Sequence, residues 1–184
     1  RARRSDSPCR SPSKGGDSGA TVSLSARVRI RPMARRDLPQ VAALELACFG
    51  REAWPLQAFK DLLAAFAGSR PARGAFWVAE DQATGGVVSY VGVEVSALRG
   101  EMDIINIAVA ASHRRRGVGC LLIERIVRLC RQRGVSLLWL RVRASNRGAR
   151  GFYRRMGFQE RGRFAGYYLE PDESAVIMAM EPEA

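Results

Sequence analysis

A strand-to-helix junction rich in arginine and glycine constrains this chain more than any other feature. Apolar, β-prone residues over 104–109 are followed by a short turn and by Arg-x-x-Gly-x-Gly at 114–119, which opens onto a helical periodicity. The first N–H groups of a helix lack partners inside it, and the helix dipole adds positive charge there. Gly117 and Gly119 carry no Cβ that would keep a diphosphate away from these donors. The junction predicts a phosphate-binding loop.

Two familiar phosphate loops do not fit this pattern. The chain contains no Gly-x-x-x-x-Gly-Lys-Ser/Thr, which excludes a P-loop NTPase. Gly119 is followed by Cys-Leu-Leu, so the third glycine of the dinucleotide fingerprint is missing as well. A purely structural turn remains the alternative at this point, since glycines also close turns that bind nothing.

The residues after the loop predict a helix, a buried strand and a second helix. The first helix extends to about Arg133 and ends with Gly134 as its C-terminal cap residue. Residues 135–142 form a largely buried strand in this interpretation, and Asn146 is placed to cap the second helix. The predicted core faces are Val118, Leu121, Leu122, Ile126, Leu129 and Cys130 on the first helix, and Ala149, Phe152, Tyr153 and Met156 on the second.

The segment LLWLRVRASNRGARGFYRRMGF, residues 137–158, resembles the second half of the bacterial RimI family almost residue for residue. That family is a branch of the GNAT acetyltransferases and acetylates the N-terminal alanine of a small-subunit ribosomal protein. The Arg-x-x-Gly-x-Gly turn resembles the acetyl-CoA loop of GNAT proteins. The similarity continues through GYYLEPDESAVIMAM at 166–180, is weaker over 28–59, and covers about 27–180 in all.

The resemblance implies the GNAT fold, an α/β (α+β) domain with a central, mostly antiparallel sheet and flanking helices. In that fold the strands ending at Val109 and Val142 run parallel and splay apart, and acetyl-CoA enters the gap. We expect one domain over 27–184. Its other expected elements are strands at 28–32, 75–80, 87–95, 158–168 and 175–180, and helices at 35–48 and 55–67.

The resemblance also implies which residues contact the cofactor, acetyl-CoA. Backbone groups of the strand before the loop would meet the pantetheine and the acetyl carbonyl, and the loop would hold the phosphates. An asparagine that caps the following helix contacts CoA in this family. Carried onto this chain, the positions are Ile107, Ala108, Val109, Arg114, Arg115, Arg116, Gly117, Val118, Gly119, Cys120 and Asn146.

Three tyrosines match positions with roles in the family. Tyr153 stands where the family's tyrosine faces the sulfur as general acid, and a phenol with a pKa of about 10 can protonate a thiolate at neutral pH. The alternative is that Tyr153 is only a core residue of its helix. Tyr167 and Tyr168 resemble the paired tyrosines that hold a peptide near its N-terminus, although they could equally be ordinary strand residues.

One position departs from the family. RimI relatives have Trp-Leu-Glu-Val with the glutamate as general base, whereas this chain has Arg141 there, and an arginine accepts no proton at neutral pH. The base is therefore another residue, a water, or missing. On the preceding strand, Asp103 resembles the residue that serves as the base in other GNAT branches, two pleats before Ile107 and on its side of the strand, so we expect Asp103 to be the base. His113 lies in the phosphate turn, and we expect it to be too far from the sulfur.

These observations favour an acetyl-CoA-dependent N-acetyltransferase acting on the N-terminal α-amine of a protein, such as a ribosomal-protein alanine. A GNAT enzyme for another amine, a small metabolite or a lysine side chain, is the alternative among enzymes. Arg141 keeps open a third reading, in which the protein binds CoA without turnover and serves as a binding module. The sequence leaves the oligomeric state open.

Composition limits the other possibilities. The 184 residues carry a formal net charge of +12, but no aromatic residues interleave with the arginines, so we expect no dedicated nucleic-acid surface. No apolar run reaches the length of a membrane span, and the four cysteines form no Cys-x-x-Cys pair. We therefore expect a cytoplasmic protein without a metal site. Residues 1–26, rich in Ser, Gly, Pro and Arg, are expected to be a disordered or non-native tail.

Overall fold

A seven-stranded sheet in the order β1-β2-β3-β4-β5-β7-β6 organises the computed structural model, which describes residues 27–68, 73–96 and 100–182. The pair β4–β5 is parallel and the other neighbours are antiparallel. The expected GNAT sheet is therefore confirmed. The expected tail at residues 1–26 lies outside the described residues. The strands are β1 Val28–Pro32, β2 Gly74–Asp81, β3 Val87–Ser96, β4 Glu101–Val109, β5 Leu137–Arg143, β6 Gln159–Leu169 and β7 Asp172–Met180.

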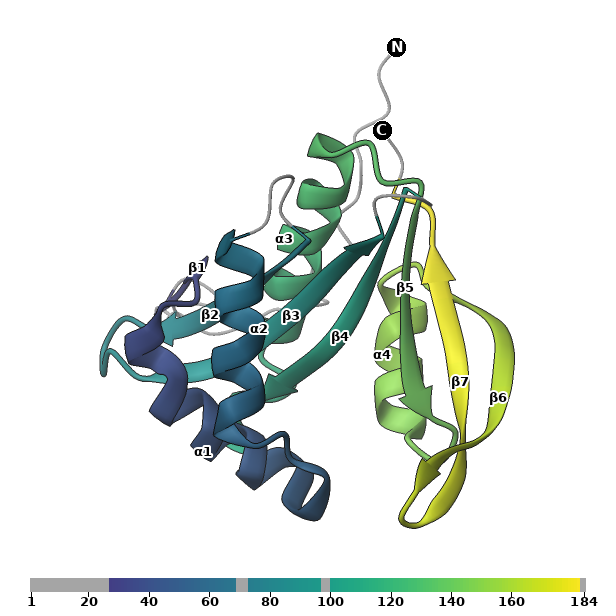
Figure 1. The fold of residues 1–184 in the computed structure, drawn as a ribbon, viewed down its shortest axis with the longest axis horizontal. Coiled ribbons are helices and arrows are strands. Elements are labelled where there is room, and N and C mark those ends of the chain that lie inside the picture. The colour runs from purple at the N-terminus through teal and green to yellow at the C-terminus, as the bar shows by residue number, and fades with distance from the viewer. Residues whose placement is uncertain (1–26, 69–72, 97–99, 183–184) are drawn as a thin grey trace, which may run out of the picture.

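Helices cover both faces of this sheet (Figure 1). On one face, α1 and α2 pack on β2, β3 and β4; on the other, α3 packs on β1–β4 and α4 contributes to the same core cluster from the β5–β7 side. None of the helices in these ranges is long and apolar enough to span a membrane. Their bounds are α1 Leu38–Phe49, α2 Leu56–Gly68, α3 Val118–Gln132 and α4 Arg147–Arg155, with 3-10 turns η2 Arg35–Asp37, η3 Gly50–Glu52 and η4 Ala111–His113.

The parallel strands β4 and β5 pair only at their beginnings. The ladder joins residues 101–104 to 137–140, and beyond it the strands diverge, as Figure 1 shows. The carboxyl-terminal halves of both strands thus lose one neighbour, which opens the sheet between β4 and β5. This divergence is the splayed pair that the resemblance implied, and it positions the candidate site.

A bulge in β4 changes which face its side chains occupy. Asn106 pairs with Gly92 and Ile104 with Val93, so Ile105 is an additional residue on β4. As a result Ile104 and Ile107 both contact the core under α3, whereas Ile105 contacts the core under α1 and α2. Asp103 alternates with Ile104 and faces α2, away from Ile107. The expectation that Asp103 and Ile107 share a face is wrong, because one inserted residue reverses the alternation.

Other expectations changed only locally. The buried face of α3 contains Ile123, while Leu121 is half-buried, so the face is rotated slightly from the predicted one. β5 begins at Leu137, since the N–H of Val135 bonds the carbonyl of Cys130 and completes the end of α3. The predicted caps are confirmed: Gly134 has φ +63°, and Asn146 Oδ1 accepts the N–H of Ala149 at 3.0 Å.

Candidate active site

The phosphate loop has the geometry of an open helix N-terminus. Gly117 is the N-cap of α3 with φ +84°, a left-handed conformation that glycine adopts without strain. A Cβ added to Gly117 would meet no atom within 4 Å, so the protein itself leaves this space open. Gly119 differs, because its Cβ would lie 3.3 Å from the ring of Phe152 on α4. The absence of a side chain at Gly119 is therefore explained by its packing against Phe152. At Gly117, the absence of a side chain leaves the end of α3 accessible.

Three arginines surround this helix end, and all are exposed. Arg114 Nε donates to the carbonyl of Val109 at 3.0 Å, which ties the loop to the end of β4. Arg115 has φ +58°, and with Arg116 it precedes Gly117 directly. Exposed guanidinium groups next to unpaired helix N–H groups suit a diphosphate, so these residues fit the phosphate part of CoA. His113 is bound elsewhere, with Nε2 at 3.4 Å from Asp81 Oδ2.

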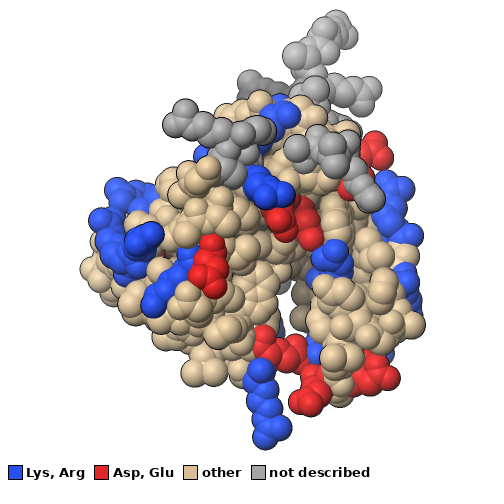
Figure 2. All heavy atoms as spheres, in the orientation of Figure 1, with Lys and Arg blue, Asp and Glu red and all other residues tan. Residues whose placement is uncertain are grey.

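A cleft of about 540 Å³ occupies the splayed region between β4 and β5. Figure 2 shows the molecule hollowed between the β1–β4 part and the β5–β7 part. Ala108 is buried under α1 and α2, so only its backbone could meet a ligand. The lining includes five of the residues singled out from the sequence: Ile107, Asn146, Tyr153, Tyr167 and Tyr168.

Tyr153 reaches the cleft from the apolar face of α4. Its side chain is buried, with its ring 5.2 Å from that of Phe152 and 5.6 Å from that of Phe158. Burial raises the pKa of Tyr153, and the neighbouring Tyr168 hydroxyl adds to the rise. The phenol thus keeps its proton at neutral pH, as a general acid must. The two interpretations of Tyr153, as a core residue and as a general acid, are compatible, because both place its ring on the apolar face of α4.

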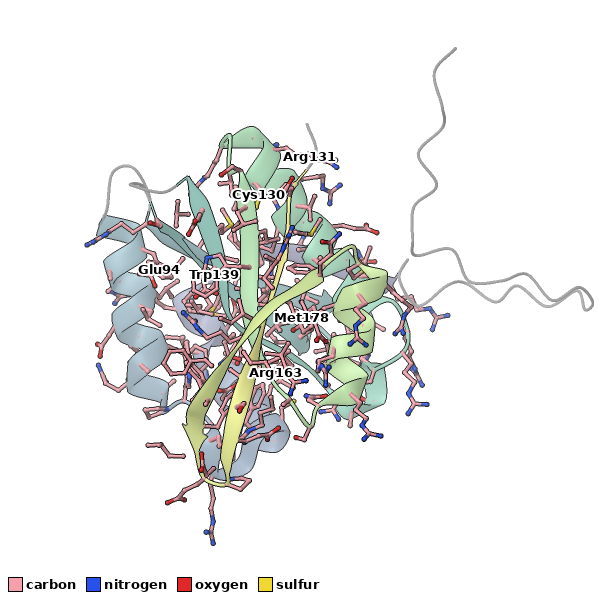
Figure 3. The ribbon with its side chains drawn as sticks, turned by 90° about the vertical axis from the view of Figure 1, so that its right-hand side faces the viewer. Glu94, Cys130, Arg131, Trp139, Arg163 and Met178 are labelled. Carbon is pink, nitrogen blue, oxygen red and sulfur yellow. The ribbon has the colours of Figure 1, made fainter. Side chains whose placement is uncertain are left out.

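Arg141 lines the cleft, and Asp103 is not among the lining residues. Arg141 Nη1 lies 3.0 Å from Asp103 Oδ2, and the guanidinium carbon lies 4.2 Å from the ring centroid of Trp139. Burial raises the pKa of Asp103 to about 6, while Arg141 lowers it and Glu94 raises it further. Figure 3 shows Trp139 and Glu94 on the side of the sheet that carries α2. Asp103 therefore pairs with Arg141 on the α2 side of the sheet, whereas Ile107 lies on the opposite face.

A buried glutamate on α1 was not found by sequence reasoning. Glu45 is 1% exposed and lines the cleft. Its carboxylate accepts hydrogen bonds from the Tyr90 hydroxyl, from Asn106 Nδ2 at 3.0 Å and from the Trp54 N–H at 3.0 Å. These donors come from β3, from the residue after the bulge of β4 and from the segment between η3 and α2. Glu45 thus fixes the wall of the cleft, and its only sequence signal was a charge on an otherwise apolar helix face.

Arg143 joins the two walls at the substrate end. It forms ion pairs with Glu52 on η3 and with Glu173 on β7, and its guanidinium carbon lies 4.0 Å from the ring centroid of Tyr168. Glu52, Arg143 and Tyr168 line both the cleft and an outer cavity of about 700 Å³. The outer cavity is lined by Phe49, Arg51, Glu52, Trp54, Arg143, Tyr167, Tyr168, Leu169, Glu170 and Pro171.

Comparison with known proteins identifies the family. The model of the acetyltransferase (GNAT) family matches residues 38–158, well over half of the chain. The chain belongs to the GNAT family. The resemblance stated from the sequence is confirmed.

Named relatives of this GNAT protein include the ribosomal protein bS18-alanine N-acetyltransferase of Escherichia coli K12, 42% identical over 82 residues. The match covers 44% of this chain and 55% of that protein, so the chain aligns with little more than half of the relative's length. The crystal structure of the E. coli ribosomal-protein-S18-alanine N-acetyltransferase matches with a TM-score of 0.73 and 27% identity, covering 85% of this chain and 95% of that chain.

The cofactor expectation agrees with the family. GNAT acetyltransferases use acetyl-CoA, and one solved structure with the same fold, a NatC complex, is bound to a Gag peptide and CoA. That chain has a TM-score of 0.71 and 18% identity, covering 84% of this GNAT protein and 98% of its own length. Within the described ranges, no group of three or more His, Cys, Asp or Glu side chains could hold a metal ion.

Proposed function

We propose that this protein transfers the acetyl group of acetyl-CoA to the N-terminal α-amine of a protein, with a ribosomal-protein alanine as the first candidate acceptor. The observation that carries the proposal is the position of Tyr153, a buried phenol in the cleft of a GNAT fold. Relatives named for acetylation of an N-terminal alanine support the choice of acceptor.

The roles we assign follow from the chemistry of amide formation. Acetyl-CoA supplies an acetyl thioester when it is bound. The amine nitrogen forms the new bond to the acetyl carbon, the carbon–sulfur bond breaks, and the sulfur requires a proton. Tyr153 Oη provides that proton, while backbone groups of Ile107 to Val109 orient the acyl chain. Arg114 to Arg116, Gly117 to Cys120 and Asn146 hold the remainder of CoA.

The proton lost by the amine requires a different acceptor from the one expected. Asp103 is held by Arg141, faces away from Ile107 and does not line the cleft. We therefore assign Asp103 to positioning Arg141, and we assign the amine's proton to water in the cleft. An amine delivered without a carboxylate base reacts slowly at low pH, where the neutral form is scarce.

The outer cavity is the part of the site suited to a peptide. Its aromatic residues, including Tyr167 and Tyr168, offer flat apolar surfaces with polar edges, which suit an extended backbone. A peptide entering there would pass Arg143 and Glu52 before its amine reached Tyr153. This route favours an N-terminus over an internal lysine as the acceptor.

A thiol-release assay tests the proposal. The full chain is mixed with acetyl-CoA and a peptide that begins with alanine, and released CoA is measured together with the mass of the peptide. We expect one acetyl group per peptide, located on the α-amine, and about a hundredfold slower release with Tyr153→Phe. Binding of acetyl-CoA without any acetylated product would contradict the proposal and would favour a binding module.

A further inference from the structure

Arg141 is the cleft residue whose charge the reaction itself does not use. The cleft lining contains four charged side chains: Glu45, Glu52, Arg141 and Arg143. Glu45 accepts from three donors, and Arg143 is bound to Glu52, to Glu173 and to two backbone carbonyls. These groups are committed to holding the walls of the cleft. Arg141 alone among the four has donors left for a ligand.

The guanidinium of Arg141 is fixed on one side and open on the other. One nitrogen, Nη1, bonds Asp103, and the group stacks 4.2 Å from the Trp139 ring and 5.5 Å from the Tyr167 ring. Within the described part of the chain, Nη2 and Nε have no hydrogen-bond partner, and the side chain is 31% exposed. A stacked and tethered arginine loses little entropy when it binds a planar anion.

We propose that Arg141 determines specificity by binding a carboxylate that lies within the first two residues of the acceptor. The inference rests on the proposed function, since it deepens the choice of acceptor at the same site. Two open N–H donors in a planar fork match the two oxygens of a carboxylate. An acceptor with an acidic residue at the first or the second position, such as one that begins Ala-Asp or Ala-Glu, would thus be preferred over one with neutral or basic residues at both positions.

The position of Arg141 in the cleft favours a carboxylate over other anions. Arg141 stands on β5 where the divergence from β4 begins, and its guanidinium carbon lies 5.5 Å from the ring centroid of Tyr167, which lines both the cleft and the outer cavity. A peptide with its amine near Tyr153 has only its first residues at this depth. The acidic groups available there in a peptide are the side chains of aspartate and glutamate.

Charge reversal provides the test, with the full chain and acetyl-CoA at saturation. The acceptors are peptides of one sequence with Asp, Glu, Asn, Gln, Ala or Lys at the first or the second position. Free glutamate and its α-amide are also included. The enzymes are the wild type, Arg141→Glu, Arg141→Gln, and Arg163→Glu as control. Arg163 is exposed on β6 (Figure 3) and does not line the cleft, so its reversal changes the net charge equally.

We expect the wild type to show a kcat/KM at least tenfold higher for Asp or Glu peptides than for Asn or Gln peptides. Arg141→Gln should remove this preference, Arg141→Glu should favour the Lys peptides, and Arg163→Glu should retain the wild-type order. If the wild type and Arg141→Gln rank the peptides identically, the proposal is overturned, even if Arg141→Glu is inactive.

The same experiment separates this inference from the proposed function. Acetylation of glutamate and of its α-amide but of no peptide would contradict the proposed acceptor class, while loss of both activities with Arg141→Gln would still support the side-chain carboxylate contact. Equal rates for all peptides in the wild type would overturn the contact and leave α-amine acetylation intact. A complete absence of product would overturn both.

Discussion

The predicted phosphate loop and the proposed substrate end of the cleft differ in how far apart in the chain their residues lie. At the loop, the open helix end and its arginines occupy residues 114–120, one continuous segment. At the substrate end, Glu52 and Arg143 are 91 positions apart, and Glu45 and Asn106 are 61 apart. The comparison teaches that a candidate site formed by neighbouring residues can be predicted from the sequence alone. A site formed by pairs of side chains that are distant in the chain can be predicted only once the fold is known.

The largest effect should come from Tyr153, which lines the cleft. Tyr153→Phe removes the proton donor and keeps the ring packing, so kcat should fall about a hundredfold or more. Binding of acetyl-CoA, measured by calorimetry, should change little. Tyr167→Phe is the comparison: it also removes a phenol hydroxyl from the cleft, but from a residue proposed to contact the peptide, so it should act on the KM for the peptide and leave kcat nearly unchanged. An unchanged kcat in Tyr153→Phe would return this residue to a purely structural role.

The next prediction concerns the substrate end and pH. The pKa of Asp103 is raised to about 6 in the folded protein, so the folded state binds a proton there more tightly than the unfolded state. Wild-type stability should therefore rise relative to Asp103→Asn as the pH falls from 7 to 4, by about 2–3 kcal/mol. Denaturant unfolding at a series of pH values measures this difference.

Arg141 provides the internal check on that result. Because Arg141 lowers the pKa of Asp103, Arg141→Gln should move the pH dependence to higher pH. A difference between wild type and Asp103→Asn that does not vary with pH would show that Asp103 is not buried as described.

Gly117 tests the predicted phosphate loop. Gly117→Ala places a Cβ in the open approach to α3 and should weaken acetyl-CoA binding about tenfold through lost phosphate contacts. Gly134→Ala is the matched control: Gly134 has φ +63°, and a Cβ there also meets no atom within 4 Å. Both variants should lose similar stability, about 1–2 kcal/mol, because both force alanine into a left-handed conformation. Equal acetyl-CoA affinity in the two variants would show that the loop is a structural turn that does not bind the phosphates.

Arg143 should give a smaller effect, confined to the substrate end. Arg143→Gln breaks the ion pairs that join the two walls, so the KM for a peptide should rise about fivefold with little change in acetyl-CoA affinity. Arg161→Gln is the control, because Arg161 pairs with Glu181 on an exposed edge. A KM that changes equally in both variants would argue against a role for Arg143 in shaping the mouth.

The smallest effect should come from the N-terminus. A chain that begins at Arg27 should fold and acetylate a short peptide at the rate of the full chain, because residues 1–26 contain few apolar side chains. Peptide kinetics and a thermal melt check this. Slower reaction with an intact protein substrate alone would reveal a docking role.

The sequence predicted the open N-terminus of α3 and most of the fold because those signals are local. Helix periodicity, the Asn146 cap and Gly134 each depend on a few neighbouring residues. The β4 bulge could not be predicted in this way, since an inserted residue leaves no mark on an apolar strand, and it reversed the face of Asp103. The roles of Arg143 and Glu45 depend on partners that only the folded chain brings close.

The most direct test of the account is a competition between two kinds of amine. Equal amounts of a peptide with a free α-amine and a peptide with a blocked N-terminus and an internal lysine are incubated with the full chain and isotopically labelled acetyl-CoA. Mass spectrometry then locates the label. The account predicts that the label accumulates on the α-amine, at least tenfold over the lysine, and that Tyr153→Phe suppresses it. Label on the lysine side chain, or label on neither peptide while acetyl-CoA binds, would contradict it.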